Sequence, residues 1–557
     1  MPSRSPKSRP AAGAAVAALA VGVLALAGCT SSGKSGNASS GAPSQSPSPS
    51  TSGAPASDPL AQTGFIREDS GTAQTGGTLN AVSAVDAPSG YDPVKGVLDG
   101  LTGMSEYAAI YDLLLSYDPV AQEFVPQLAE SMEPNAAGNE WTIKLRPDVQ
   151  FSDGTPLDAA AVKYNLDRWG GDDSIGYYYP TVGEIKSVTV SDPLTVVIHL
   201  NTVDRELNWI FTQGFGLIGS PTAIKNMGEA KFNLHPVGAG PFMVSKFTPG
   251  SELSLVRNPN YWGGDVPLDG IKFTYATGDE TLLQSLQNGD LNLINIQAPP
   301  TIKKGVDAGL SGFVWLRTEG STVVMNERKG HVTSDVNVRK AIALAIDPAV
   351  INERVYNGVG LPTSSLFPAD MYGTTVEGVT PDMDQAKQLV AAAKTEHNWD
   401  GSLEMLCKPS PEAQQLCLTE QAMLNAAGFK ITVKPAASTD AWVEALYIKG
   451  EYDISTTSNQ VTGKVGLWTQ LTQEFTGPYT PTGYNDPRMA DALNALRTVS
   501  TDAELVTTLD KIQTVYNETV PEVVVATGRN ALLWQGIGGI IPSSNGTVLF
   551  NKAYLTS

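Results

Sequence analysis

Two cysteines stand close together in a position that suits a disulfide bond. Cys407 and Cys417 flank a short polar loop between a predicted strand, 403–407, and a predicted helix, 411–426. A disulfide here would form in an oxidising compartment and stabilise the fold by about 2–3 kcal/mol. Two free thiols are the alternative. A metal site has little support, because no histidine lies beside the pair in the sequence.

The third cysteine, Cys29, ends a segment that is typical of an exported protein. Residues 1–10 carry three basic residues and no acid, and residues 11–27 are small or apolar. This order predicts a secretory signal peptide over 1–28. The last residues, Leu-Ala-Gly-Cys, resemble the lipobox of bacterial lipoproteins, in which the cysteine takes a lipid and becomes the mature N-terminus. The alternative is an ordinary small residue at a cleavage site.

Residues 29–73 are rich in Gly, Ser and Pro and form a predicted linker. This composition buries too little apolar area to offset the entropy of ordering, so we expect disorder. Residues 28–35, Gly-Cys-Thr-Ser-Ser-Gly-Lys-Ser, match the phosphate-binding loop pattern. That loop needs a following helix whose N-terminal amides hold the phosphates, and residues 36–52 predict none. We therefore expect no nucleotide site.

The common catalytic motifs do not occur in this chain. There is no H-E-x-x-H and no G-x-S-x-G, and Pro241 follows Gly238-Ala239-Gly240, which is no dinucleotide loop. Acid pairs such as Asp172-Asp173 are expected by chance among 57 acidic residues. We predict a protein that is not an enzyme and needs no cofactor.

Charge and length narrow the class of protein further. The net charge of −20 opposes binding to nucleic acid, so we expect no nucleic-acid partner. Outside the signal segment no apolar run reaches about 18 residues, so the membrane association would be an anchor at Cys29. A chain of 557 residues is too long for one compact core and predicts two or three lobes.

Strand and helix patterns alternate from residue 76 to the end, which predicts an α/β or mixed fold. The predicted strands are 76–82, 141–146, 185–190, 195–200, 253–257, 271–276, 403–407, 430–434 and 522–526. The predicted helices are 105–115, 159–169, 279–288, 335–356, 384–396, 411–426 and 501–517.

Residues 141–164 read Trp-Thr-Ile-Lys-Leu-Arg-Pro-Asp-Val-Gln-Phe-Ser-Asp-Gly-Thr-Pro-Leu-Asp-Ala-Ala-Ala-Val-Lys-Tyr. This segment closely resembles the signature of the extracytoplasmic solute-binding proteins of family 5, the peptide, nickel and oligosaccharide receptors of ABC importers. Further segments are similar in the same order: 76–79, 92–93, 110–114, 126–131, 236–242, 257–262, 335–347 and 355–358. The resemblance covers about residues 75–550. Most of these motifs have structural explanations, such as the Asp-Gly-Thr-Pro turn and an N-cap at Asp158.

The resemblance implies a two-lobed periplasmic-binding-protein-like fold of type II, with an extra subdomain in lobe I. Lobe I would be 74–316 with the returning segment 522–557, and lobe II would be 317–521. The hinge would be two strand crossings, near 315–325 and near 522–526. Solute would be buried between the lobes as they close.

The resemblance carries over the family's ligand contacts only in part. Peptide binders of this family hold the peptide's amino terminus with an Asp in the loop that follows a Tyr-Asp strand. Here that loop is 456–464, and it has no acid. Thr457, Ser458, Asn459 and Gln460 can hydrogen-bond neutral groups instead. The alternative is that the loop is misaligned and the anchor lies elsewhere. Weaker candidates for the pocket are Asp86, Asn326 and Trp468; a core position for Trp468 is equally compatible with its sequence.

The resemblance implies a monomeric, lipid-anchored receptor on the outer face of the cell membrane. It would capture an oligopeptide or similar-sized solute and deliver it to the permease subunits of an ABC importer, without catalysis. Two alternatives stay open: a neutral solute such as an oligosaccharide, and a signalling lipoprotein on the same fold.

Overall fold

The computed structural model describes residues 58–67, 71–83, 90–96, 98, 103–172, 174–175, 178–459, 461–476 and 480–557. The predictions for the signal peptide, for Cys29, for the linker up to residue 57 and for the site residues Asp86 and Gln460 therefore fall outside the described residues.

The largest sheet among the described residues has 13 strands and runs through the whole folded part. Ten strands follow one another in the order β10 (Phe242–Thr248), β11 (Glu252–Arg257), β12 (Gly270–Tyr275), β3 (Thr78–Ser83), β13 (Leu293–Ile296), β20 (Glu522–Trp534), β14 (Ser311–Met325), β18 (Ile454–Thr457), β16 (Ser402–Cys407) and β17 (Lys430–Pro435). Three strands pair beside this path: β1 (Gly64–Arg67), β15 (Leu361–Pro362) and β19 (Val461–Thr462).

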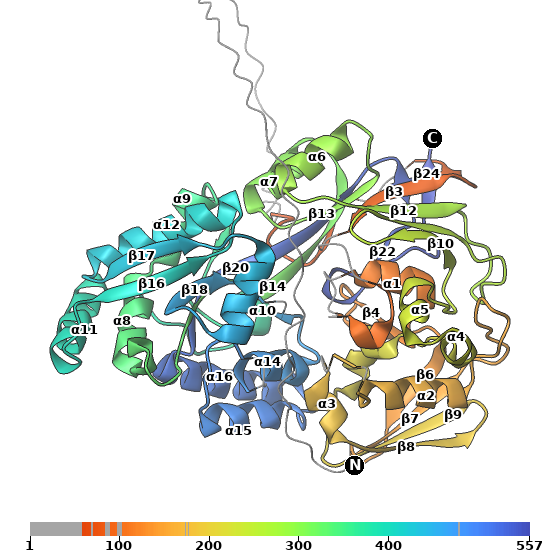
Figure 1. Cartoon of the computed structure of the whole chain (residues 1–557), viewed down its shortest axis with the longest axis horizontal. Helices are drawn as coiled ribbons and strands as arrows, with labels where there is room; N and C mark the ends of the chain where they lie inside the picture. Colours follow the sequence, from red (N-terminus) through yellow and green to blue (C-terminus); the bar gives the residue numbers. More distant parts are fainter. Residues whose placement is uncertain are drawn as a thin grey trace, which may run out of the picture. The chain divides into compact units, whose positions relative to one another are not determined.

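The antiparallel strands β14 and β20 form the crossing in the middle of this sheet (Figure 1). Their register is regular from Ser311 to Arg317 and again from Thr322, and it shifts between these stretches. Glu319 has a φ of 53°, a left-handed conformation that costs energy for a residue with a side chain. The pair is therefore two regular ladders joined by an irregular, strained segment.

Buried apolar residues gather separately on the two sides of this crossing. On the first side they come from residues 60–316 and 531–553. On the second side they come from residues 323–525. Both β14 and β20 contribute to each side, and Figure 1 shows the two strands leading from one group of helices to the other.

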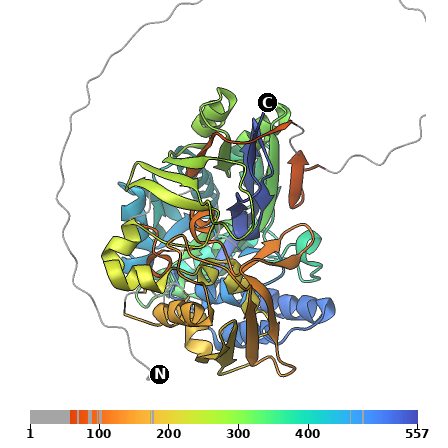
Figure 2. The same ribbon diagram turned by 90° about the vertical axis from the view of Figure 1, so that its right-hand side faces the viewer.

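The first side is completed by smaller sheets and by helices. A four-stranded sheet has the order β6 (Ala129–Pro134), β7 (Glu140–Leu145), β9 (Thr195–Leu200) and β8 (Ile185–Asp192), and β4 (Leu115–Asp118) pairs with β5 (Glu123–Pro126). The helices are α1 (Met104–Tyr111), α2 (Ala159–Trp169), α3 (Tyr179–Glu184), α4 (Pro221–Met227), α5 (Glu229–Leu234), α6 (Asp279–Gln287) and α7 (Pro299–Asp307). The last strands return here, as the turned view in Figure 2 shows: β21 (Ile537–Gly538) and β24 (Tyr554–Thr556) join β2 (Ala73–Gln74), and β22 (Ile541–Pro542) pairs with β23 (Val548–Leu549).

The second side carries the remaining helices around the parallel strands β16 and β17. They are α8 (Val336–Ala345), α9 (Pro348–Val355), α10 (Ala369–Tyr372), α11 (Met383–Glu396), α12 (Pro411–Ala426), α13 (Thr439–Val443), α14 (Leu467–Phe475), α15 (Pro487–Leu496) and α16 (Asp502–Thr519). Strand β16, helix α12 and strand β17 form the predicted βαβ unit. Cys407 and Cys417 are joined by a disulfide across its first turn.

Two expectations about local structure need correction. The predicted helix 335–356 is two helices, because Pro348 disfavours helical backbone at Asp347, whose side chain then caps α9. The predicted disordered linker ends earlier than residue 73, since β1 pairs with β14. Phe65 explains why this segment is ordered, because its ring packs edge-on against Phe313, with the ring centroids 4.9 Å apart.

Candidate functional site

Two cavities lie beside the crossing, and each is lined from both sides. The smaller has a volume of about 120 Å³ and is lined by Leu98, Tyr178, Trp209, Gln213, Asn459, Val461, Thr469, Gln470, Gln473, Glu474 and Asn545. The larger has a volume of about 370 Å³, and its lining includes Gln62, Tyr117, Trp209, Trp315, Asp370, Met371, Lys464 and Asn545. Trp209 and Asn545 line both, so the cavities are neighbours.

The strand crossing itself holds the loop that borders the smaller cavity. Strand β19 pairs with β14 at Arg317 and Thr318, directly before the irregular segment. The backbone amide of Asn459 donates to the carbonyl of Glu319 at 3.0 Å. The guanidinium of Arg317 donates to the carbonyl of Asn459 at 2.6 Å. Asn459 is thereby fixed against the most strained part of β14.

Helix α14 supplies the polar wall of the smaller cavity from the second side. It contacts α3, which belongs to the first side (Figure 1). Its N-cap, Gly466, has a φ of 65°, and a Cβ there would lie 2.0 Å from the Trp209 ring. Only glycine allows this approach. Thr469, Gln470, Gln473 and Glu474 follow at helical spacing and share the face that lines the cavity.

A set of ionic contacts joins the two sides beyond the cavity. Arg497, at the end of α15, lies 3.2 Å from a carboxyl oxygen of Glu184 and 3.7 Å from one of Asp204. The Arg497 and Asp204 side chains are 6% and 5% exposed, so this contact is largely shielded from solvent. Glu206 accepts hydrogen bonds from the first amides of α14, and burial raises its pKa to about 8. The two sides are thus held together around the cavities.

The predicted loop residues lie at or near the smaller cavity to different degrees. Asn459 lines it. Thr457 is buried in β18, where its hydroxyl lies 3.4 Å from the Tyr447 hydroxyl, and Ser458 is exposed. Trp468 packs in the core of the second side, donates to Asn494 at 3.1 Å and lies beneath Arg497. Among these described residues, only Asn459 lines either of the two cavities.

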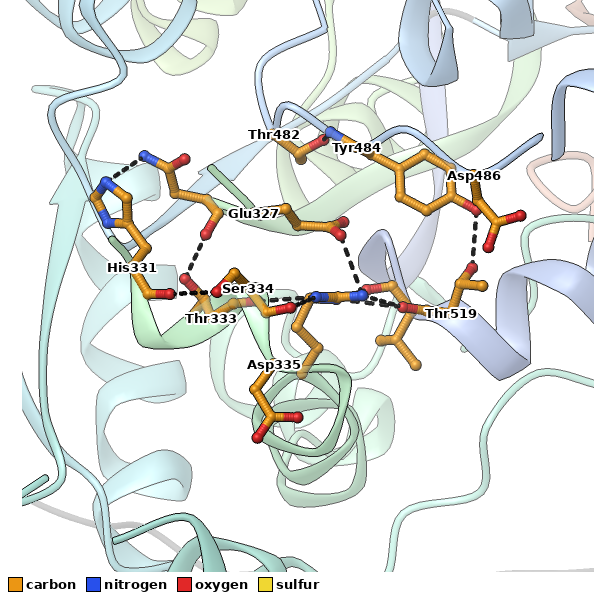
Figure 3. Close-up of polar contacts among 12 residues, drawn as sticks. Glu327, His331, Thr333, Ser334, Asp335, Thr482, Tyr484, Asp486 and Thr519 are labelled. Atoms are coloured by element: carbon orange, nitrogen blue, oxygen red, sulfur yellow. Dashed lines mark hydrogen bonds and ion pairs between the residues drawn. The ribbon is translucent and has the colours of Figure 1, made fainter. Parts of the chain in front are cut away.

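Asn326 has a structural position at the far end of β14. It is fully buried, and its amide donates to the carbonyls of Gly450 and Tyr452 at 2.9 Å. It therefore takes no part in lining the two cavities. The neighbouring polar network centres on Arg339, which donates to the carbonyls of Thr333, Ser334 and Thr519 and pairs with Glu327 at 3.1 Å (Figure 3).

Sequence reasoning missed the residues that dominate the smaller cavity, namely Trp209, Gln213, Glu474 and Asn545. They come from three distant segments that only the crossing brings together. One signal was available: residues 467–475 are amphipathic, and their polar face is made of amide, hydroxyl and carboxyl groups without a basic residue.

One group of metal-binding residue types occurs among the described residues. Possible ligand atoms of Asp335, Glu396 and His397 lie within 4.8 Å of one another. Glu396 and His397 are exposed and Asp335 is half-buried, and His397 Nε2 lies 2.7 Å from Asp335 Oδ2. This hydrogen-bond contact accounts for the close approach of His397 and Asp335.

Comparison with known proteins identifies the family. Residues 123–466 match the family described as bacterial extracellular solute-binding proteins, family 5 Middle. The chain belongs to this family. It is therefore a member of a family of binding proteins, not of enzymes.

Individual relatives are distant. The heme-binding protein A of Haemophilus influenzae is 25% identical over 55% of this chain and 60% of its own length. The dipeptide-binding protein of Escherichia coli is 24% identical over 65% of this chain and 71% of its own. The oligopeptide-binding protein AppA of Bacillus subtilis, solved with a nonapeptide, is 20% identical with a TM-score of 0.73, covering 87% of this chain and 100% of that one. This family 5 protein thus has the mixed α/β periplasmic-binding-protein fold.

None of the helices in the described ranges of this family 5 protein has the length and apolar character needed to cross a bilayer.

Proposed function

We propose that this chain is a lipid-anchored receptor that captures a peptide or similar-sized solute and delivers it to an ABC import permease. Solute would lie in the two cavities beside the crossing of β14 and β20. The observation that carries this proposal is the lining of both cavities by residues from both sides of that crossing. The larger cavity lies within the range of about 300–1,000 Å³ that is common for small-molecule sites.

The lobes of this receptor would be 74–316 with 522–557, and 317–521. The separate buried clusters on the two sides support this division, because each could stay packed while the other moves. The irregular segment around Glu319 supports a hinge, since the ladders on either side of it are regular. Opening would admit solute and closure would bury it, with the contacts of Arg497 forming on closure.

Family membership supports export and transport, and the names of relatives support the solute class. They describe binding of dipeptides, of a nonapeptide and of heme. A neutral solute such as an oligosaccharide is the second candidate. The many amide and hydroxyl groups around the smaller cavity favour it, because such groups hydrogen-bond sugar hydroxyls without a charge. Attachment through Cys29 rests on the sequence pattern.

Small-angle scattering of residues 58–557 tests solute-driven closure. A tryptic digest of casein serves as the peptide probe and a maltodextrin mixture as the neutral probe. We expect one of them to reduce the radius of gyration. A bound probe that leaves the radius unchanged would contradict capture by closure.

A further inference from the structure

Among the described residues that line the smaller cavity, one is charged, and it is acidic. Glu474 projects from α14, and the other lining residues are apolar, aromatic, amide or hydroxyl side chains. No lysine, arginine or histidine of the described chain lines this cavity. Glu474 therefore meets no basic partner from the described residues across the space that it borders.

Two further carboxyl groups stand behind Glu474. Glu319 lies in the irregular part of β14, Glu522 starts β20, and their side chains are 0% and 1% exposed. The negative charges of Glu319 and Glu474 act on Glu522, and Asn459 faces both Glu319 and Glu474. Within the described chain, Arg317 is the one basic group acting on this trio. If all three carboxyl groups were ionised, one guanidinium would leave negative charge uncompensated, so burial favours their protonated forms, and a neighbouring cation would lower the cost of ionisation.

The opposite wall carries an independent sign that a donor is missing. Gln213, on the first side, is 4% exposed and lines the same cavity. Its amide nitrogen donates to Ser544 at 2.6 Å and to Thr212 at 3.2 Å. Its carbonyl oxygen has no hydrogen-bond donor among the described residues. A buried acceptor without a donor costs about 1–3 kcal/mol, so a ligand that supplies the donor recovers this energy.

We propose that the smaller cavity is a subsite for an organic cation, a primary ammonium or guanidinium group of the solute, held by Glu474 with Gln213 Oε1 as a second acceptor. This deepens the proposed function and rests on it. Ammonium and guanidinium groups carry several donors and no acceptor, which complements this wall. Trp209 and Tyr178 also line this space, and aromatic rings can attract cations. The acid-free loop 456–464 would thus not exclude charged solutes, because the acid comes from the following helix.

The protonation of Glu474 should make the affinity of this subsite depend on pH. Burial and the neighbouring charge of Glu319 raise the pKa of Glu474 to about 8, opposed by the Asn459 amide. The charged and titratable groups that face this trio are Arg317 on β14, Tyr372 on α10, Tyr452 beside β18 and Tyr516 on α16. Near neutral pH, an arriving cation would displace the proton of Glu474 into solvent. Affinity for a cationic probe would therefore rise with pH towards 8, while affinity for its neutral counterpart would not.

The experiment compares matched probes by equilibrium dialysis of residues 58–557. Tetra-alanine carries a terminal ammonium, acetyl-tetra-alanine carries none, and acetylated tri-alanyl-lysine carries one on a side chain. We expect wild-type protein to prefer one ammonium probe over acetyl-tetra-alanine by at least tenfold. The preferred probe tells whether the ammonium is terminal or on a side chain.

Variants separate the subsite from the fold. Glu474→Gln should lose the preference and its pH dependence, and Glu474→Asp should keep part of it. Glu123→Gln, an exposed acid on β5, is the matched control and should behave as wild type. Thermal unfolding of each variant verifies that it folds.

The outcomes are distinct. Equal binding of all three probes, or a preference that survives Glu474→Gln, overturns the cation subsite and leaves solute capture standing. Binding of maltodextrins with no binding of any peptide probe would also overturn the cation subsite and leave solute capture standing. Failure of every probe, maltodextrins included, overturns solute capture and the subsite together.

Discussion

Gly320 and Gly528 face each other where β14 and β20 cross, so closely that a Cβ on Gly320 would lie 1.9 Å from the Gly528 amide nitrogen. The irregular segment of β14 thus has no room for a side chain at this point. Gly320→Ala should lower the free energy of unfolding by about 1–3 kcal/mol, because the added carbon overlaps backbone that cannot move away freely. Thermal and denaturant unfolding measure this change.

Gly183→Ala is the control for that substitution, because nothing lies within 4 Å of its added carbon. It should leave stability unchanged or slightly higher. Equal effects of the two substitutions would contradict a tight crossing at Gly320.

Arg497 should act on solute affinity more than on stability. If the lobes close as proposed, closure brings Arg497 to the buried Asp204, so Arg497→Gln would leave an uncompensated carboxyl only in the closed arrangement. We expect the probe that binds the wild-type protein in equilibrium dialysis to bind this variant about tenfold more weakly, which is equivalent to about 1.4 kcal/mol. Arg488→Gln is the control, since Arg488 is exposed and pairs within the second side. Equal dissociation constants for the two variants would argue against a contact that forms on closure.

Stability should fall as pH rises from about 5 to 8. Burial raises the pKa of Glu319 to about 7 and those of Glu420 and Glu474 to about 8, from an ordinary 4.5. In this range the folded state keeps protons that the unfolded state has released, so each pH step costs folding free energy. Denaturant midpoints at pH 5, 6.5 and 8 measure the slope. A midpoint that rises across this range would show that these groups are ionised in the folded protein.

Reducing the disulfide between Cys407 and Cys417 should destabilise the second side. The bond closes a loop with a sequence separation of 10, for which chain entropy gives about 2–3 kcal/mol. Unfolding with and without a reductant, with alkylation and mass spectrometry to count free thiols, measures the loss. Two alkylated thiols with unchanged stability would contradict this contribution.

Cys29→Ser should release the protein from membranes. If Cys29 carries the lipid, the variant lacks the only anchor that we propose, and ultracentrifugation should move it from the pellet to the supernatant. A variant that still sediments with membranes would refute the lipobox interpretation. A carbonate wash of the wild type distinguishes anchoring from loose adsorption.

Sequence predicted local elements well where local chemistry decides them. Helix α2 has the bounds that its Asp158 cap and apolar spacing indicated, because both signals act within a few residues. The break at Pro348 also had a local cause, yet the continuous apolar spacing of 335–356 concealed it. Sequence reasoning did not predict that β1 is an ordered strand, because its packing depends on Phe313, which lies far along the chain.

The lining of the two cavities could not be predicted from the sequence. Gln213, Glu474 and Asn545 line one cavity only because β14 takes the chain to the second side and β20 returns it to the first. The loop residue Asn459 was found because it follows a recognisable strand. Its acidic neighbours were not, because they reach it from β14 and α14.

Native mass spectrometry of residues 58–557 tests solute capture most directly. The protein is measured as purified, and again after dialysis against the casein digest and against maltodextrins. We predict a stoichiometric adduct in at least one sample, and its loss in Trp209→Ala, which removes a wall common to both cavities. An adduct of equal occupancy in Trp209→Ala would place the solute elsewhere. No adduct in any sample would contradict the receptor account.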